Sequence, residues 1–160
     1  MASAHRLEGV LLAAVVVGLL VACDPEPVMS QIGVSGDATG HVVISFVPCG
    51  GQAVRTVEVD EEVGAGRRPV WLILGGTTVW PGSVQVGSAP SGFRTVVPFR
   101  TGLAVDRHYL AGVNRSGGGF QVVMDFVPAE LAPTNIEDGH GHKISPSVFR
   151  TNAERFCAGL

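Results

Sequence analysis

Apolar and polar residues alternate in short runs along most of the chain after residue 40, and turns rich in glycine and proline separate the runs. In the clearest run, 120–127, every second residue from Phe120 to Phe126 is large and apolar. A period of two places such residues on one face of a β-strand. The pattern predicts seven strands, at 41–47, 53–60, 70–74, 83–87, 93–99, 107–114 and 120–127.

The spacing of these runs predicts the fold class. Several short strands with turn residues between them are typical of a β-sandwich. The run 70–74 is apolar on both faces, so it is expected to be a central strand with Trp71 in the core. We predict a mainly β protein, an immunoglobulin/fibronectin-like β-sandwich of about seven strands, with a small barrel as the alternative. The cysteines lack the immunoglobulin spacing, so this resemblance is one of architecture only.

The C-terminal segment has a helical pattern instead. Ser145 and Pro146 suit an N-cap and a first helical position. Phe149, Ala153 and Phe156 recur at the spacing of one helical face. The sequence therefore predicts a short helix at about 146–156.

The N-terminal end carries an apolar run, VLLAAVVVGLLVA, at 10–22. A bilayer-spanning helix needs about 20 apolar residues. The run is shorter than that but has the length of the apolar part of a signal peptide, with Arg6 before it. We predict a signal peptide at residues 1–22.

The end of this run, Leu20-Val21-Ala22-Cys23, resembles the lipobox of bacterial lipoprotein precursors. The resemblance implies lipid on the sulfur of Cys23, cleavage just before it, and attachment to the outer face of the bacterial plasma membrane. Residues 23–40 would then be a lipidated tether and 41–160 the globular domain. An ordinary secretory signal with an incidental cysteine is the alternative. Ten arginines against the single Lys143 fit a GC-rich, actinobacterial source.

Two cysteines remain once Cys23 is assigned to lipid. Exported proteins meet an oxidising environment in which paired thiols form disulfides. We therefore predict a Cys49–Cys157 disulfide; two free thiols are the alternative.

Charge excludes one class of partner. The net charge is −3 and basic residues do not cluster beyond Arg67-Arg68, so nucleic-acid binding is not expected. The acidic run 60–62 is interpreted as a solvated turn rather than a calcium site, because adjacent carboxylates on a strand end cannot all face one ion.

The stretch 135–143 is the best candidate for metal chemistry. Asp138, His140 and His142 alternate with glycines, and a carboxylate with two imidazoles could bind zinc or copper. The alternative is a polar loop before the helix. No other cofactor is indicated.

Two further candidates are weaker. Trp80 lies in a Val-Trp-Pro-Gly stretch that could form an exposed loop tip and contact a protein partner, or it could lie against the sheet edge. His108, Asp106 and Ser116 could act as general base, orienting residue and nucleophile of a hydrolase, but nothing fixes their geometry and the nucleophile motif is absent. No catalytic residue is predicted.

These observations predict a membrane-anchored, extracytoplasmic lipoprotein that acts as a non-catalytic binding or scaffolding module of the cell envelope. A metal-binding lipoprotein and a hydrolase with a site not visible in sequence are the alternatives.

Overall fold

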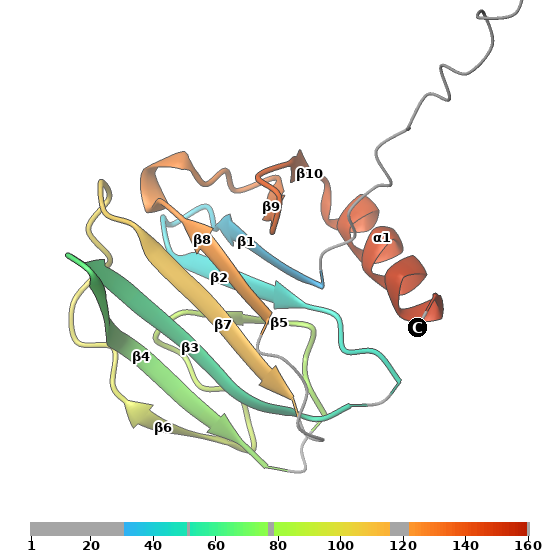
Figure 1. Cartoon of the computed structure of the whole chain (residues 1–160), viewed down its shortest axis with the longest axis horizontal. Helices are drawn as coiled ribbons and strands as arrows, with labels where there is room; N and C mark the ends of the chain where they lie inside the picture. The colour runs from blue at the N-terminus through green and yellow to red at the C-terminus, as the bar shows by residue number, and fades with distance from the viewer. Residues whose placement is uncertain (1–30, 51, 77–78, 116–121, 160) are drawn as a thin grey trace, which may run out of the picture.

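The computed structural model describes residues 31–50, 52–76, 79–115 and 122–159. Ten strands form two antiparallel sheets of five strands each, and one helix follows them in the chain (Figure 1). The mainly β class and the C-terminal helix predicted from the sequence are confirmed.

The first sheet has the strand order β10-β9-β1-β2-β5. Its strands are β1 (Ile32–Gly36), β2 (Val42–Phe46), β5 (Ser83–Gln85), β9 (Ile136–Asp138) and β10 (Lys143–Ile144). The second sheet has the order β6-β4-β3-β7-β8. Its strands are β3 (Val54–Val63), β4 (Gly66–Gly75), β6 (Phe93–Val97), β7 (Tyr109–Arg115) and β8 (Val122–Phe126).

The hydrophobic core lies between the two sheets. Alternation gives strands such as β2, β3 and β8 one buried apolar face, and the apolar side chains of both sheets meet in one cluster. Trp71 on β4 and Phe46 on β2 are the largest of the fully buried side chains. All seven predicted strands are present, with boundaries that differ by a few residues.

Strand β1 was not predicted, and it corrects the expected tether. Residues 32–36 pair with β2 on one side and with β9 on the other, so they are a central part of the first sheet. Gly33 explains the close approach of β9: a Cβ atom there would lie 2.3 Å from Cγ2 of Ile136. Gly33, one of the small residues that give this segment the composition of a linker, therefore allows β9 to pack against β1.

Helix α1 (Pro146–Ala158) follows a short 3-10 turn, η1 (Pro128–Glu130), and strands β9 and β10. Ser145 is its N-cap and accepts a hydrogen bond from the backbone N–H of Val148. Phe149 and Ala153 form its buried face, as the sequence spacing indicates. Within the described part of the chain, no helix is long and apolar enough to cross a membrane.

The close contact at Gly33 gives a test of the β1–β9 pairing. We expect Gly33→Ala to lower the free energy of unfolding by about 1–3 kcal/mol, the usual penalty for overpacking. Gly36→Ala is the matched control in the same strand, because its nearest neighbour would be 3.6 Å away, an ordinary contact. Denaturant unfolding of both variants measures the difference, and equal stabilities would show that β9 is not packed on Gly33.

Candidate functional site

The site with the strongest chemistry is a buried carboxylate at the far end of β3. Val57, Val59 and Glu61 follow one another on the inner face of this strand. The side chain of Glu61 is only 5% exposed. A charged group in such a place needs ionic partners, because burial of an unpaired charge is costly.

Two arginines provide these partners. Arg68 donates a hydrogen bond to Oε2 of Glu61, and Arg107 donates one to Oε1, so each carboxylate oxygen has its own guanidinium. The two arginine side chains are 65% and 57% exposed. The result is a buried anion that holds two cations at the protein surface.

A β-bulge places Arg68 on the same face as Glu61. Val59 pairs with Trp71 and Asp60 pairs with Pro69, so Val70 is an extra residue in β4. If β4 alternated regularly through Val70, Arg68 would lie on the opposite face from Trp71, because the two residues are three positions apart. With the bulge, Arg68 stands directly opposite Glu61 in the register. Bulges often re-aim side chains beside functional sites.

The pKa values of the group reflect these contacts. The hydrogen bond from Arg68, followed by that from Arg107, lowers the pKa of Glu61. The same hydrogen bond to Glu61 raises the pKa of Arg107. The carboxylate is therefore ionised at neutral pH, and both arginines keep a fixed partner.

The two arginines border a small cleft of about 180 Å³. It lies between the end of the β3–β4 hairpin and the loop before β7. Its lining residues are Glu61, Arg68, Val70, Thr101, Gly102, Leu103, Ala104, Arg107 and Tyr109. The hydroxyl of Tyr109 accepts a hydrogen bond from the backbone N–H of Ala104 at 2.9 Å, which fixes this loop to the sheet.

The sequence pattern alone does not indicate this site. The run 60–62 is not the solvated turn that was expected; it lies within β3, and Glu61 is buried. The continuing alternation of Val57 and Val59 with Glu61 was the available signal. The partners could not be identified, because Arg107 is distant in sequence and the bulge reverses the face on which Arg68 lies.

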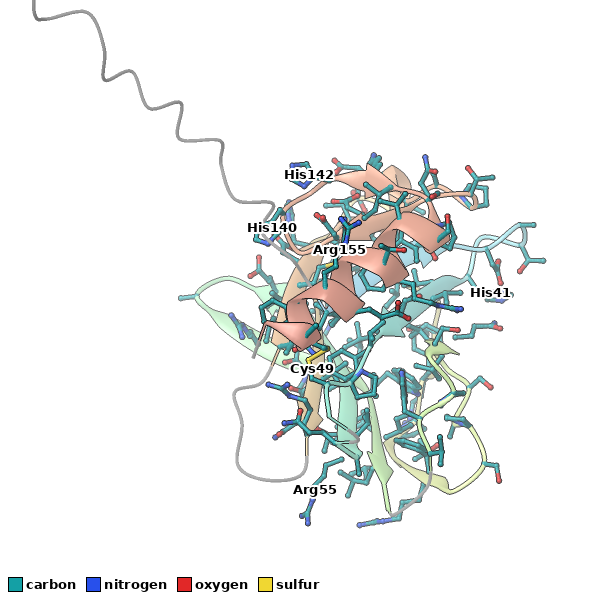
Figure 2. All side chains as sticks on the ribbon, turned by 90° about the vertical axis from the view of Figure 1, so that its right-hand side faces the viewer. His41, Cys49, Arg55, His140, His142 and Arg155 are labelled. Atoms are coloured by element: carbon teal, nitrogen blue, oxygen red, sulfur yellow. A yellow bond between two sulfur atoms is a disulfide. The ribbon has the colours of Figure 1, made fainter. Side chains whose placement is uncertain are left out.

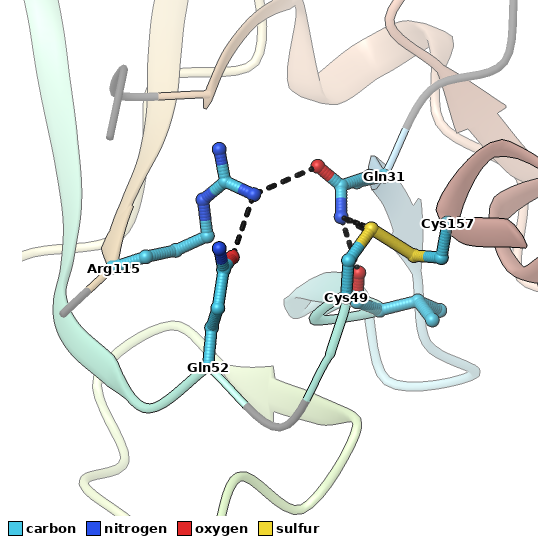
Figure 3. Close-up of a disulfide and its surroundings, with 6 residues drawn as sticks. Gln31, Cys49, Gln52, Arg115 and Cys157 are labelled. Carbon is cyan, nitrogen blue, oxygen red and sulfur yellow. Dashed lines mark hydrogen bonds between the residues drawn. A yellow bond between two sulfur atoms is a disulfide. The ribbon is translucent and has the colours of Figure 1, made fainter. Parts of the chain in front are cut away.

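The predicted Cys49–Cys157 disulfide is present, and it joins the loop after β2 to the end of α1. Figure 3 shows Gln31 beside it. The side-chain amide of Gln31 donates to the carbonyl of Val47 at 2.9 Å and contacts Sγ of Cys49 at 2.8 Å. Arg115 in turn donates to Oε1 of Gln31 at 3.3 Å. These contacts hold the beginning of β1 against the disulfide.

The predicted metal ligands lie in the turn between β9 and β10. Asp138 is buried, and its Oδ1 accepts hydrogen bonds from the backbone N–H groups of His140 and His142, at 2.9 and 3.0 Å. Its Oδ2 lies 3.3 Å from Nδ1 of His142. Asp138 therefore stabilises the turn. The two histidine rings are exposed and their centroids are 6.3 Å apart. Figure 2 labels both at the surface near the helix.

No cluster of three or more His, Cys, Asp or Glu side chains suited to hold a metal ion is found among the described residues. The zinc or copper site at Asp138, His140 and His142 stays a prediction from the sequence. Its three residues share one turn, but the carboxylate is already engaged with the backbone.

Trp80 is not an exposed loop tip. The residue is 8% exposed, and its indole Nε1 donates to the carbonyl of Phe46 at 2.8 Å. Its ring meets Phe93 edge-on, with centroids 5.9 Å apart. Trp80 thus belongs to the core cluster, where it contacts β2 and β6, and its side chain does not form the exposed loop tip predicted as a partner contact.

The residues considered for a hydrolase do not form a described site. His108 is exposed and pairs with Asp125, at 3.5 Å between Nδ1 and Oδ1. The negative charge of Asp106 instead makes a small contribution to the raised pKa of the adjacent Arg107. Ser116 and the lipobox cysteine, Cys23, lie outside the described residues.

Comparisons of the chain with protein-family models, with curated proteins and with solved structures find no match.

The lowered pKa of Glu61 predicts a pH-dependent contribution to stability. A carboxylate with a depressed folded-state pKa stabilises the fold above its unfolded pKa of about 4.3, and this contribution is lost as pH falls through the folded value. We expect the melting temperature of Glu61→Gln to be lower than that of the wild type at pH 7 and the two values to converge towards pH 3. Calorimetry across this range is the measurement; curves that stay parallel would contradict the role of Glu61. Glu62→Gln, at an exposed neighbour, is the control.

Asp138 offers a test of the turn and of metal binding together. We expect Asp138→Ala to lose about 1–3 kcal/mol of stability, because two part-buried backbone N–H groups lose their acceptor. Asp138→Asn keeps one carbonyl oxygen and is expected to lose less. Titration with zinc or copper in the calorimeter then tests the metal hypothesis, which fails if a His140→Ala, His142→Ala double variant keeps the wild-type affinity.

Proposed function

We propose that this protein is an extracytoplasmic lipoprotein, anchored to the outer face of a bacterial plasma membrane by lipid on Cys23, that serves as a non-catalytic binding or scaffolding module of the cell envelope. The observation that carries the proposal is the disulfide. The chain has three cysteines, and Cys49 and Cys157 are joined to each other. Disulfides persist in oxidising compartments, so the pair supports export.

The pairing leaves Cys23 as the cysteine without a partner in the chain. It stands at the end of the apolar run 10–22, in the lipobox-like sequence. A single acyl chain gives only marginal attachment, and stable anchoring takes two signals. The multiple acyl chains that the resemblance implies would supply this.

The position of Gln31 gives the anchored domain an orientation. Seven residues lie between Cys23 and Gln31 in the sequence, so the eight Cα–Cα steps that join them span at most about 29 Å when fully extended. Gln31 is fixed beside the disulfide, so this end of the domain would lie close to the membrane. The turn between β3 and β4 lies at the opposite side of the molecule from the end of α1 (Figure 1), so the cleft beside Glu61 would face away from the membrane.

The strand order supports the finer fold class, an immunoglobulin/fibronectin-like sandwich. In that class the third, sixth and seventh strands are neighbours in one sheet, and the first, second and fifth lie in the other. If β6 is counted as an additional strand, β7 and β8 are the sixth and seventh strands, and they are neighbours of β3 in one sheet. Strands β1, β2 and β5 are neighbours in the facing sheet. Strand β6 extends the first group beyond β4, while β9 and β10 extend the second.

Tyr109 supports the same assignment. Immunoglobulin-like domains carry a tyrosine near the start of the strand equivalent to β7, and its hydroxyl bonds to the backbone a few residues upstream. Tyr109 is the first residue of β7, and its hydroxyl binds the backbone of Ala104. Two features depart from the class: Trp71 is on β4 rather than β3, and the disulfide does not join the two sheets across the core.

Lipid anchoring is tested by mass and by fractionation. We expect the mature protein to begin at Cys23 with acyl mass on its N-terminal peptide, and Cys23→Ser to leave the membrane fraction. Reductant should add about 2 Da to the intact mass, two hydrogens for one disulfide. Cys49→Ser serves as the control that removes a cysteine from the domain and keeps the anchor. A membrane-bound protein whose N-terminal peptide lacks lipid would exclude the proposal.

A further inference from the structure

We propose that the cleft between Arg68 and Arg107 binds the oxyanion group of a ligand, a carboxylate or a phosphate. This ligand class extends the proposed binding function and rests on it. Four observations carry it: the exposure of the arginines, their fixed position, the size of the cleft and its further donors.

The arginines have donors left for a ligand. A guanidinium carries five N–H groups, and the contact with Glu61 uses one from each arginine. More than half of each side chain is exposed, whereas the carboxylate between them is buried. A ligand that enters the cleft therefore meets the two cations before it meets Glu61.

Glu61 acts as a positioning residue. A free surface arginine samples many rotamers and loses side-chain entropy when it is fixed. Here both guanidiniums are already held by the same buried carboxylate. Two cations against one anion leave a net positive charge among the lining residues, since Asp106 is not one of them. The planar fork of arginine matches both carboxylate and phosphate oxygens.

The size of the cleft limits what it can take. Sites for whole small molecules have volumes of roughly 300–1,000 Å³. The cleft has about 180 Å³, enough for one charged group rather than for a cofactor. Tyr109 also lines the cleft; it is only 3% exposed, and its hydroxyl accepts from Ala104 and carries one further hydrogen. Thr101 adds a hydroxyl at the wall of the cleft.

The test uses the full mature protein in detergent micelles, titrated calorimetrically with sodium acetate and with inorganic phosphate at constant ionic strength. Sodium chloride is the blank. Binding of acetate alone indicates a carboxylate ligand, and binding of phosphate alone indicates a phosphate ligand; binding of both supports the shared chemistry. No heat above the chloride blank for either anion overturns the proposal.

Variants locate the site. We expect Arg68→Gln and Arg107→Gln each to weaken binding about ten- to hundredfold, the range for one charge-assisted hydrogen bond. Arg55→Gln is the matched control: Arg55 is also an exposed arginine of β3 (labelled in Figure 2), but it lies about 20 Å from Glu61 along the strand and does not line the cleft. Equal affinity in all three variants would overturn the assignment.

A measurement on the unaltered protein covers variants that fail to fold. Phenylglyoxal modifies accessible arginines, and peptide mass mapping identifies which ones react. The bound anion should protect Arg68 and Arg107 and leave Arg55 unchanged, whereas equal reaction at all three would contradict the site. The acyl mass on Cys23 is read from a different peptide, so failure of the anion site and failure of the lipid anchor are separate results.

Discussion

The packing of the inner faces of the two sheets against each other is the constraint on which the rest of the molecule depends. Burial of one large apolar side chain contributes about 1.5–3 kcal/mol, and the cluster joins residues from both sheets. Its centre includes Trp71, whose indole N–H has no hydrogen-bond partner among the described residues. An unpaired buried donor costs about 1–3 kcal/mol, so the apolar contacts of this ring offset an unmade hydrogen bond.

The same face carries the candidate site at its margin. The inner face of β3 passes from Val57 and Val59 to Glu61, where the apolar core gives way to an ion pair. Beyond this point residues 62–69 are exposed. The carboxylate of Glu61 is therefore almost completely buried, while solvent reaches its two arginine partners. Charges at such a boundary interact more strongly than they would in bulk water.

Much of the fold was predictable because local patterns determine it. Two-residue periodicity located seven strands, and the Ser145-Pro146 cap with its apolar stripe located α1. The disulfide was predictable because the lipobox-like sequence assigns Cys23 to lipid, which leaves Cys49 and Cys157 as one pair. Strands β1, β9 and β10 could not be predicted in this way: they have two to five residues and are strands because their neighbours pair with them.

The site was less predictable than the fold. Trp80 is held in the core by a hydrogen bond from its indole to the carbonyl of Phe46 on β2. The Pro-Gly residues that follow Trp80 in the sequence give no sign of this long-range contact. The role of Asp138 follows from the backbone geometry of its own turn, so the alternating histidines were visible in the sequence but the hydrogen bonds of the carboxylate were not. The ion pairs of Glu61 need the β4 bulge to position Arg68 and a loop 46 residues away to supply Arg107.

The place of β1 within the first sheet has a mechanical consequence. A protein tethered by its N-terminus receives any pulling force at the start of β1. This strand is bonded to β9 along one side and to β2 along the other, and Gln31 is fastened to the disulfide region at its entrance. Tension along the strand would load both ladders in shear, so their bonds would resist together instead of opening one after another as at a peeled edge. An N-terminal anchor of the proposed kind would therefore pull on the domain where two strand pairings resist together.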